Sequence, residues 1–427
     1  MSIQISAICK EKRADKTCVF NQSTLAFYLL YWYFLVCLLI QPAVGYLSEH
    51  LGLLPEVKTG WALVKVVLLG LVLLLGSPWF QKHIRGLGGF WGTLLVLWVL
   101  LLQVIHSPLI IKSFPSEARQ VLGNTALTGP GLWLVGLCII PIWQHVRARK
   151  RWQALSWGFF ITYVSTLVLG IATAFHRYGF LWGVYRNPKA GISYIEIADG
   201  LAIMTFWMAS LIGHRRIRNL FLALVGMLLF FTLSRASFYA YMATLSLLVL
   251  FRARWSVRIL YTSALVVIIA ASYGFYQIPA IQTPYRILAV IQNPYMDESL
   301  QLRAYYFAKG LERLSDHWLL GNFMAEVILG EGQGTYIHNW LSFWEAYGLG
   351  PFVLSLGVFA IAVLRSIKLL AWKGMLSGVR LFFVGVCFYC IINVIVARAY
   401  VWPYIWLVIG MIGTPINLAD KMVNKCA

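Results

Sequence analysis

The chain has 427 residues, of which 60% are apolar and only 12% charged, and its mean hydropathy is +0.75. This composition lies far outside the range of soluble globular proteins and excludes that class. The net charge of +20 comes from basic residues scattered over short loops. It therefore indicates contact with anionic lipid head groups rather than binding of nucleic acid.

The first 24 residues are polar and basic and contain no apolar run. We therefore expect no cleaved signal peptide, and we expect the first apolar segment after residue 25 to anchor the protein in the membrane.

Apolar runs long enough to cross a bilayer as α-helices follow along the rest of the chain. They predict an all-α polytopic membrane protein with about twelve spans, in which the seventh and eighth are short and meet at Ser234-Arg235. The chain then divides into a bundle of nine spans (1–276), an extramembrane loop (277–340) and a bundle of three spans with a cytoplasmic tail (341–427). The expected spans are 25–46, 60–77, 89–106, 129–146, 154–175, 191–213, 219–234, 236–251, 259–276, 341–364, 381–397 and 400–416.

The distribution of Lys and Arg predicts the orientation of these spans. An even number of spans places both termini on the same side as the loops near residues 82, 149, 216, 255 and 370, and these segments carry most of the basic residues. By the positive-inside rule that side is cytoplasmic, so the loop 277–340 lies on the opposite side.

All seven cysteines fall in expected spans or cytoplasmic segments, which leaves none for a disulfide on the far side. Cys387 and Cys390 form a C-x-x-C, but inside an apolar helix a thiol lacks the access and the lowered pKa that redox chemistry needs. We interpret this pair as packing residues, and we find no spacing typical of a metal site.

The loop 277–340 is the only long interval outside the expected spans. It predicts an amphipathic cap helix from about Glu298 to Asp316, followed by a glycine-rich stretch at 330–334. No Gly-Lys-Ser/Thr follows the glycines, so the stretch is not a P-loop. The expected apolar side of the helix consists of Leu300, Leu302, Tyr305, Tyr306, Leu311 and Leu314.

Arginines away from the basic side are candidate phosphate ligands, because a planar guanidinium suits bidentate contact with phosphate oxygens. Arg235 stands at the tip of the expected hairpin between two spans, Arg186 lies in an outer loop and Arg303 in the cap helix. The alternative is that each arginine reaches the membrane interface or pairs with an acidic residue of the cap. Arg235 has no acidic neighbour in the sequence, which favours a functional role.

His338 is the candidate general base. Most of the eight histidines lie near span ends, where a structural interfacial role is the ordinary one. His338 instead follows the glycine stretch, precedes Asn339 and lies seven residues before Glu345. A neutral imidazole there can accept a proton from a sugar hydroxyl.

Glu196 and Asp199 lie three residues apart in an expected span and therefore on one helical face. Carboxylates inside a membrane indicate a proton relay or a substrate contact, or else a pair with a nearby arginine. The sequence leaves their roles open.

Several motifs together resemble the O-antigen ligase / O-antigen polymerase superfamily. They are Leu233-Ser234-Arg235-Ala236, Arg303-Ala-Tyr305-Tyr306, His317-Trp-Leu-Leu-Gly321, Gly334-Thr-Tyr-Ile-His338-Asn339-Trp-Leu341, Glu345 and Gly348-Leu-Gly350. They cover roughly 230–360, and the layout of spans is similar over the whole chain. Two features depart from the family: Trp318 stands where proline is usual, and the glycines at 348 and 350 are closer than usual.

The resemblance implies a GT-C-like glycosyltransferase of the bacterial inner membrane with its active site facing the periplasm. Its donor would be a polysaccharide on undecaprenyl diphosphate. His338 would be the base for the acceptor hydroxyl, and Arg235, Arg303 and, more weakly, Arg186 would contact the diphosphate. Because the donor is already activated, the resemblance implies neither a cofactor nor a metal.

Two branches of the superfamily differ in the acceptor. A ligase transfers the polymer to a terminal sugar of lipid A–core, whereas a polymerase transfers it to another lipid-linked repeat. The compact central loop and modest length favour the ligase. A transporter of lipid or polysaccharide is the alternative from another class, but the chain lacks the internal duplication common in secondary transporters.

Overall fold

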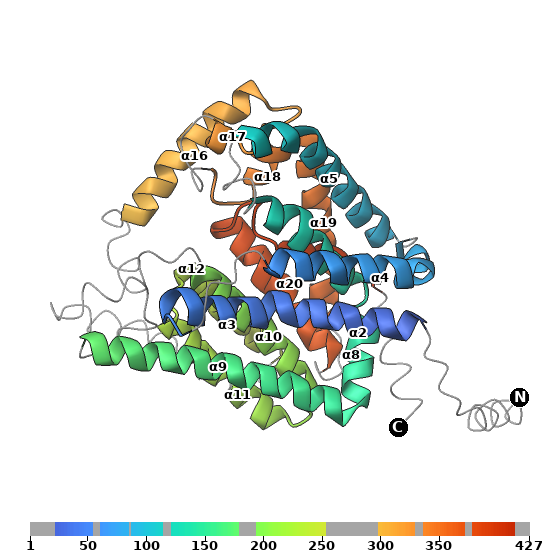
Figure 1. Cartoon of the computed structure of the whole chain (residues 1–427), viewed down its shortest axis with the longest axis vertical. Coiled ribbons are helices and arrows are strands. Elements are labelled where there is room, and N and C mark those ends of the chain that lie inside the picture. Colours follow the sequence, from blue (N-terminus) through green and yellow to red (C-terminus); the bar gives the residue numbers. More distant parts are fainter. Residues whose placement is uncertain are drawn as a thin grey trace, which may run out of the picture.

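The structure is a computed structural model, and it describes residues 22–53, 60–84, 87–113, 121–178, 194–252, 298–328, 336–371 and 378–414. Within these ranges the chain is helical and contains no strand, as predicted (Figure 1). The helices are α2 (Gln22–Leu35), η1 (Val36–Ile40), α3 (Gln41–Gly45), η2 (Tyr46–His50), α4 (Gly60–Ile84), α5 (Leu87–Ser113), η3 (Gly123–Thr128), α7 (Gly129–Leu137), α8 (Ile139–Ala148), α9 (Lys150–Tyr178), α10 (Tyr194–Leu211), α11 (Arg215–Phe231), α12 (Arg235–Arg252), α16 (Glu298–Asp316), α17 (Ala325–Ile328), α18 (Ser342–Tyr347), α19 (Leu349–Ala371), α20 (Val379–Val396) and α21 (Ile405–Met411).

Five helical stretches in the described part of the chain are long and apolar enough to cross a membrane. A sixth is added if α7 and α8, which bend by 68° at their junction, count as one span. The protein is therefore a helical membrane-embedded protein, although fewer helices meet the length criterion than the twelve expected. The five stretches are Leu25–Ser48, Gly88–Pro108, Lys150–His176, Leu349–Ala371 and Val379–Val396.

Two expected spans are placed differently in the structure. The span expected at 341–364 begins only at Leu349, because Gly348 separates the short α18 from α19. Of the span expected at 400–416, the described part ends at residue 414 and contains the seven-residue α21, whose residues are all buried. Apolar composition in this part therefore reflects burial inside the bundle. The span expected at 259–276 lies outside the described residues.

The first span changes helical type along its length. The π-helical turn η1 precedes Pro42, and η3 precedes Pro130 in the same way. Proline has no N–H to donate to the preceding turn, and a widened turn is one way for a helix to accommodate that loss.

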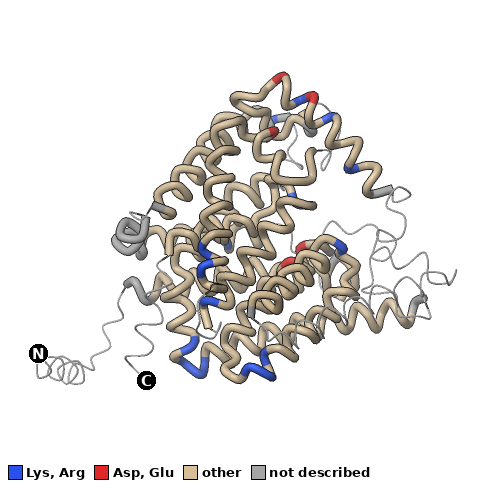
Figure 2. Tube along the Cα trace, turned by 180° about the vertical axis from the view of Figure 1, so that it is seen from behind, with Lys and Arg blue, Asp and Glu red and all other residues tan. Residues whose placement is uncertain are grey.

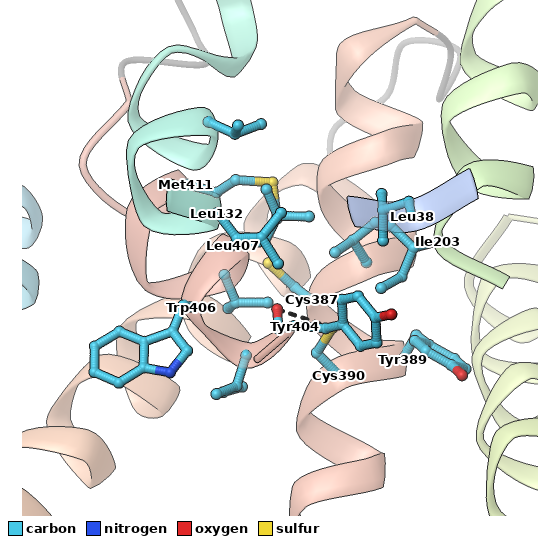
Figure 3. Packing of buried hydrophobic residues seen from close by; sticks show 14 of the residues in the cluster. Leu38, Leu132, Ile203, Cys387, Tyr389, Cys390, Tyr404, Trp406, Leu407 and Met411 are labelled. Atoms are coloured by element: carbon cyan, nitrogen blue, oxygen red, sulfur yellow. Dashed lines mark hydrogen bonds between the residues drawn. The ribbon is translucent and has the colours of Figure 1, made fainter. Parts of the chain in front are cut away.

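The centre of the bundle is α20, which packs against α10, α12, α19 and α21. Of its apolar window 83% is buried, compared with 33% for the window of α9 at the periphery. Cys387 and Cys390 lie in this core, fully buried, and the Cys390 thiol points to the backbone oxygen of Tyr404 at 3.8 Å (Figure 3). Both cysteines are packing residues, as expected.

Basic residues gather at one end of the molecule, where α8 meets α9 and where α11 begins (Figures 1 and 2). The helix α16 lies at the other end and carries both acidic and basic residues.

The turn between α18 and α19 depends on two glycines with positive φ. Gly348 has φ 79° and Gly321 has φ 70°, and the two backbones pass so closely that a Cβ on Gly348 would lie 2.2 Å from the Leu319 carbonyl oxygen. A hydrogen bond from the Leu349 N–H to that oxygen closes the contact at 3.1 Å. The two glycine motifs of the sequence therefore meet in space and fix the entrance to α19.

We expect Gly348→Ala to lower the free energy of unfolding by about 2–3 kcal/mol, since it adds a strained φ and a backbone clash. Thermal unfolding of the detergent-solubilised protein measures this as a lower Tm. Gly357→Ala is the matched control, because a Cβ at Gly357 in α19 meets no atom within 4 Å. Equal Tm values for the two variants would contradict the prediction.

Candidate functional site

A cavity of about 250 Å³ opens between α12, α16 and α20. It brings together two of the three predicted phosphate ligands, Arg235 from α12 and Arg303 from α16, which are 68 positions apart in the sequence. The third, Arg186, lies outside the described residues. The remaining lining is mostly apolar and consists of Ala236, Tyr239, Ala240, Ala243, Leu300, Ile392, Asn393, Val396 and Ala397.

Arg235 is positioned by the turn that joins α11 to α12. This turn has three residues rather than the two expected, and its middle residue, Leu233, has φ 60°. The Ser234 and Ser237 hydroxyls share a hydrogen bond of 2.7 Å across the first turn of α12. The turn thus determines where Arg235, the first residue of α12, joins the lining of the cavity.

The buried carboxylate of Asp199 connects α12 and α20, two helices that line the cavity, through hydrogen bonds. Asp199 of α10 is fully buried, and it receives hydrogen bonds from side chains of α12, α20 and the segment after α20. Its donors are Ser237 Oγ at 2.5 Å, Tyr389 OH at 2.5 Å, Arg398 Nη2 at 3.1 Å and Trp402 Nε1 at 2.8 Å.

Asp199 is therefore a partner of Arg398, one of the alternatives left open by the sequence. A buried carboxylate with an ion pair and three further donors is satisfied and serves structure. No sequence signal identified Arg398, which lies 199 positions away and directly follows Ala397 of the cavity wall. Glu196 lies half-buried in the first turn of α10.

His338 lies half-buried in a short loop against aromatic rings. Its ring centroid is 5.0 Å from that of Tyr336 and 6.2 Å from that of Tyr306 in α16. Asn339, the second residue of the predicted pair, caps the following turn, because its Oδ1 accepts the Leu341 N–H at 3.0 Å. The glycine stretch at 330–334 lies outside the described residues.

Glu345 fixes the backbone beside His338. Its Oε2 accepts the Ile337 N–H at 2.9 Å, and its Oε1 accepts Nε and Nη2 of Arg313 at 2.8 and 2.6 Å. Both side chains of this ion pair are at least nine-tenths buried. The loop that carries His338 is thus held to α16 through one carboxylate.

One face of α16 links the cavity to His338. Arg303, Tyr306, Gly310 and Arg313 follow a spacing of three, four and three residues, which places them on one side of a helix. Gly310 lies so close to Ile337 that a Cβ there would be 2.2 Å from the Ile337 side chain. Since a helix rises about 1.5 Å per residue, Arg303 at the cavity and Tyr306 at His338 are about 4.5 Å apart along the axis.

This face differs from the one expected for the cap helix. The bounds of α16, Glu298–Asp316, are confirmed, but Leu302, Tyr305 and Leu311 are exposed in the structure. Leu300 lines the cavity and Leu314 is buried, so the expected side is correct in part. Gly310 and Arg313 add a close backbone contact and an ion pair that the apolar pattern did not predict.

We expect Glu345→Ala to lower the free energy of unfolding by about 3–5 kcal/mol, because it leaves Arg313 buried without its counter-charge. Thermal unfolding measures the loss as a lower Tm, and the backbone beside His338 loses its anchor at the same time. Glu312→Ala is the control, since Glu312 is the exposed neighbour of Arg313 in α16. An unchanged Tm for Glu345→Ala would contradict the structural role of the pair.

Two guanidinium groups border an otherwise apolar cavity, and the cap helix that carries Arg303 also contacts the loop of His338, through Tyr306 one turn further along. Guanidinium groups can bind an anion, and an imidazole can transfer a proton. Among the residues that the structure describes, no group of three or more His, Cys, Asp or Glu side chains could hold a metal ion.

Fold and site together define a helical membrane-embedded protein with a cavity under a helical cap. Comparison of the chain with protein-family models and with curated proteins found no match.

Proposed function

We propose that the chain is an O-antigen ligase, a membrane glycosyltransferase that moves a polysaccharide from undecaprenyl diphosphate to a terminal sugar of lipid A–core. The observation that carries the proposal is that Arg235 and Arg303 line one cavity, while the helix of Arg303 also contacts His338. The proposal extends to twelve spans, a GT-C-like architecture and a site that faces the periplasm of the bacterial inner membrane.

In the proposed reaction an acceptor hydroxyl oxygen attacks the anomeric carbon of the donor. The bond from that carbon to the diphosphate oxygen breaks, and His338 takes the proton of the hydroxyl. Arg235 and Arg303 stabilise the charge that develops on the departing undecaprenyl diphosphate. Attack from the face opposite the diphosphate inverts the anomeric centre, so retention of configuration in the product would contradict this step.

The acceptor is tested in a strain that lacks its own ligase and receives this chain. Polymer attached to lipid A–core on a polysaccharide gel supports the ligase, and its absence with continued accumulation of lipid-linked polymer opposes it. The same gel tests the polymerase alternative in a strain that lacks its own polymerase. Such a strain makes core with a single repeat, and it would regain long polymer on receiving this chain if the chain were a polymerase.

A further inference from the structure

The turn that carries Arg235 is held from inside the bundle by a chain of buried side chains. The hydroxyls of Ser234 and Ser237 lie 2.7 Å apart, and Ser237 Oγ also donates to the Asp199 carboxylate at 2.5 Å. Arg398 Nη2 donates to Ser237 Oγ at 2.8 Å. All four of these side chains are more than nine-tenths buried. The first turn of α12 is therefore linked by side-chain hydrogen bonds to α10 and to the segment that follows α20.

Ser237 is the junction of this network. A hydroxyl has one proton and two lone pairs. Since its proton goes to Asp199, Ser237 accepts hydrogen bonds from both Ser234 and Arg398, and its capacity is used in full. Removal of this single oxygen would separate the turn from Asp199 and Arg398, while Asp199 would keep three of its four donors.

The turn needs support of this kind. Leu233, which precedes Ser234, has φ 60°, and a residue with a Cβ pays about 1–3 kcal/mol for such a conformation unless surrounding contacts enforce it. The buried ion pair of Asp199 and Arg398 adds little net stability by itself, because the loss of hydration offsets the attraction of the charges. The geometry that the pair enforces on the turn is therefore a better explanation for it than stability.

We infer that Asp199, Arg398 and Ser237 are positioning residues for Arg235. They hold the first turn of α12 so that the guanidinium of Arg235 meets the diphosphate of the donor in the cavity. This inference rests on the proposed function, which assigns the diphosphate to Arg235. A contact to developing charge is effective only when it is preorganised, and a displacement of about 1 Å can lower a rate by about a hundredfold. The network thus acts on the reaction through Arg235.

Ser237→Ala tests the inference in the purified full chain, with lipid-linked donor and lipid A–core acceptor. We expect kcat/KM for the donor to fall by about ten- to hundredfold and KM for the acceptor to stay within about twofold. In a chain that already carries Arg235→Ala, the further replacement Ser237→Ala should lower kcat/KM by less than about twofold, because no guanidinium remains to be positioned. A residue that only stabilised the fold would cost the same factor in both backgrounds.

Thr244→Val is the matched control. Thr244 is a second fully buried hydroxyl of α12, about two turns beyond Ser237, and it donates to the Ala240 carbonyl oxygen of its own helix at 2.7 Å. Its replacement also removes one buried hydroxyl from α12 but leaves the network intact. We expect kcat/KM to stay within about twofold of that of the unaltered protein.

The outcomes separate the inference from the function on which it rests. If the unaltered chain transfers no polymer, or if Arg235→Ala costs nothing, the proposed role of Arg235 fails and the inference with it. If both hold, but Ser237→Ala retains full kcat/KM or costs the same factor with and without Arg235, the inference is overturned while the function stands. If Ser237→Ala does not accumulate as folded protein, Ser234→Ala decides by the same comparison, since it cuts the link to the turn and leaves every donor of Asp199 in place.

Discussion

Replacing His338 with alanine should lower the rate of polysaccharide transfer by about 10²–10⁴-fold while leaving the amount of folded protein unchanged. General-base catalysis contributes a factor of this size, and alanine offers no group to take the proton of the acceptor hydroxyl. The imidazole is half-buried against the rings of Tyr336 and Tyr306 and is not part of the fully buried core, so its loss removes little of that core. The rate is measured with purified protein, lipid-linked donor and lipid A–core acceptor.

Two further variants make this result specific. His338→Gln retains a polar side chain but cannot serve as a base, so it should be as inactive as the alanine variant. His176→Ala removes an exposed histidine of α9 and should behave as the unaltered protein. Near-full activity of His338→Ala would remove this residue from the mechanism.

The single replacements Arg235→Ala and Arg303→Ala should each lower kcat/KM by about 10²–10³-fold. A loss of this size follows when one preorganised contact to the charge that develops in the transition state is removed. Because both guanidinium groups border the same cavity, we expect the double replacement to cost less than the product of the two single effects. Lysine should restore activity only in part, since an ammonium cannot reproduce the bidentate geometry. Steady-state kinetics with varied donor concentration measures all three.

Arg216→Ala controls for the loss of a positive charge as such. Arg216 is exposed in the first turn of α11, and α11 lies at the opposite end of the molecule from the cap helix α16 (Figure 1). Its replacement should leave kcat/KM within about twofold of the unaltered protein, as is usual for surface positions. Equal losses for Arg216→Ala and Arg235→Ala would oppose a diphosphate site in the cavity.

The sequence predicted the parts of this site that depend on local patterns. The bounds of α16 follow from its change of composition, and the short motifs around Arg235 and Arg303 selected two residues that do line one cavity. Periodicity predicted the packed face of α16 only in part: Leu300 and Leu314 lie inward as expected, but Gly310 and Arg313 supply buried contacts that an apolar pattern does not indicate.

Contacts between segments far apart in the chain could not be predicted from the sequence, for a physical reason. Helices of a membrane bundle are apolar on all sides, so their pattern does not say which side faces a neighbour. The pairing of Asp199 with Arg398, and its hydrogen bonds from Ser237 and Tyr389, arise only when α10, α12 and α20 are packed together. For the same reason, the apolar run at 400–416 resembled a span although α21 is a short buried helix.

The spacing of contacts along α16 makes the cap helix sensitive to changes of register. Arg303 and Arg313 are ten residues, or about 15 Å, apart on one face, and the second is fixed to Glu345. One residue inserted between Tyr306 and Gly310 would turn the preceding part of the helix by about 100° and carry Arg303 out of the cavity. Insertion of seven residues, close to two full turns, would restore the direction of Arg303 but displace it by about 10 Å. Exposed loop tips usually tolerate insertions, but α16 is held on both sides of this point, so we expect insertions of one or of seven residues to disrupt the site.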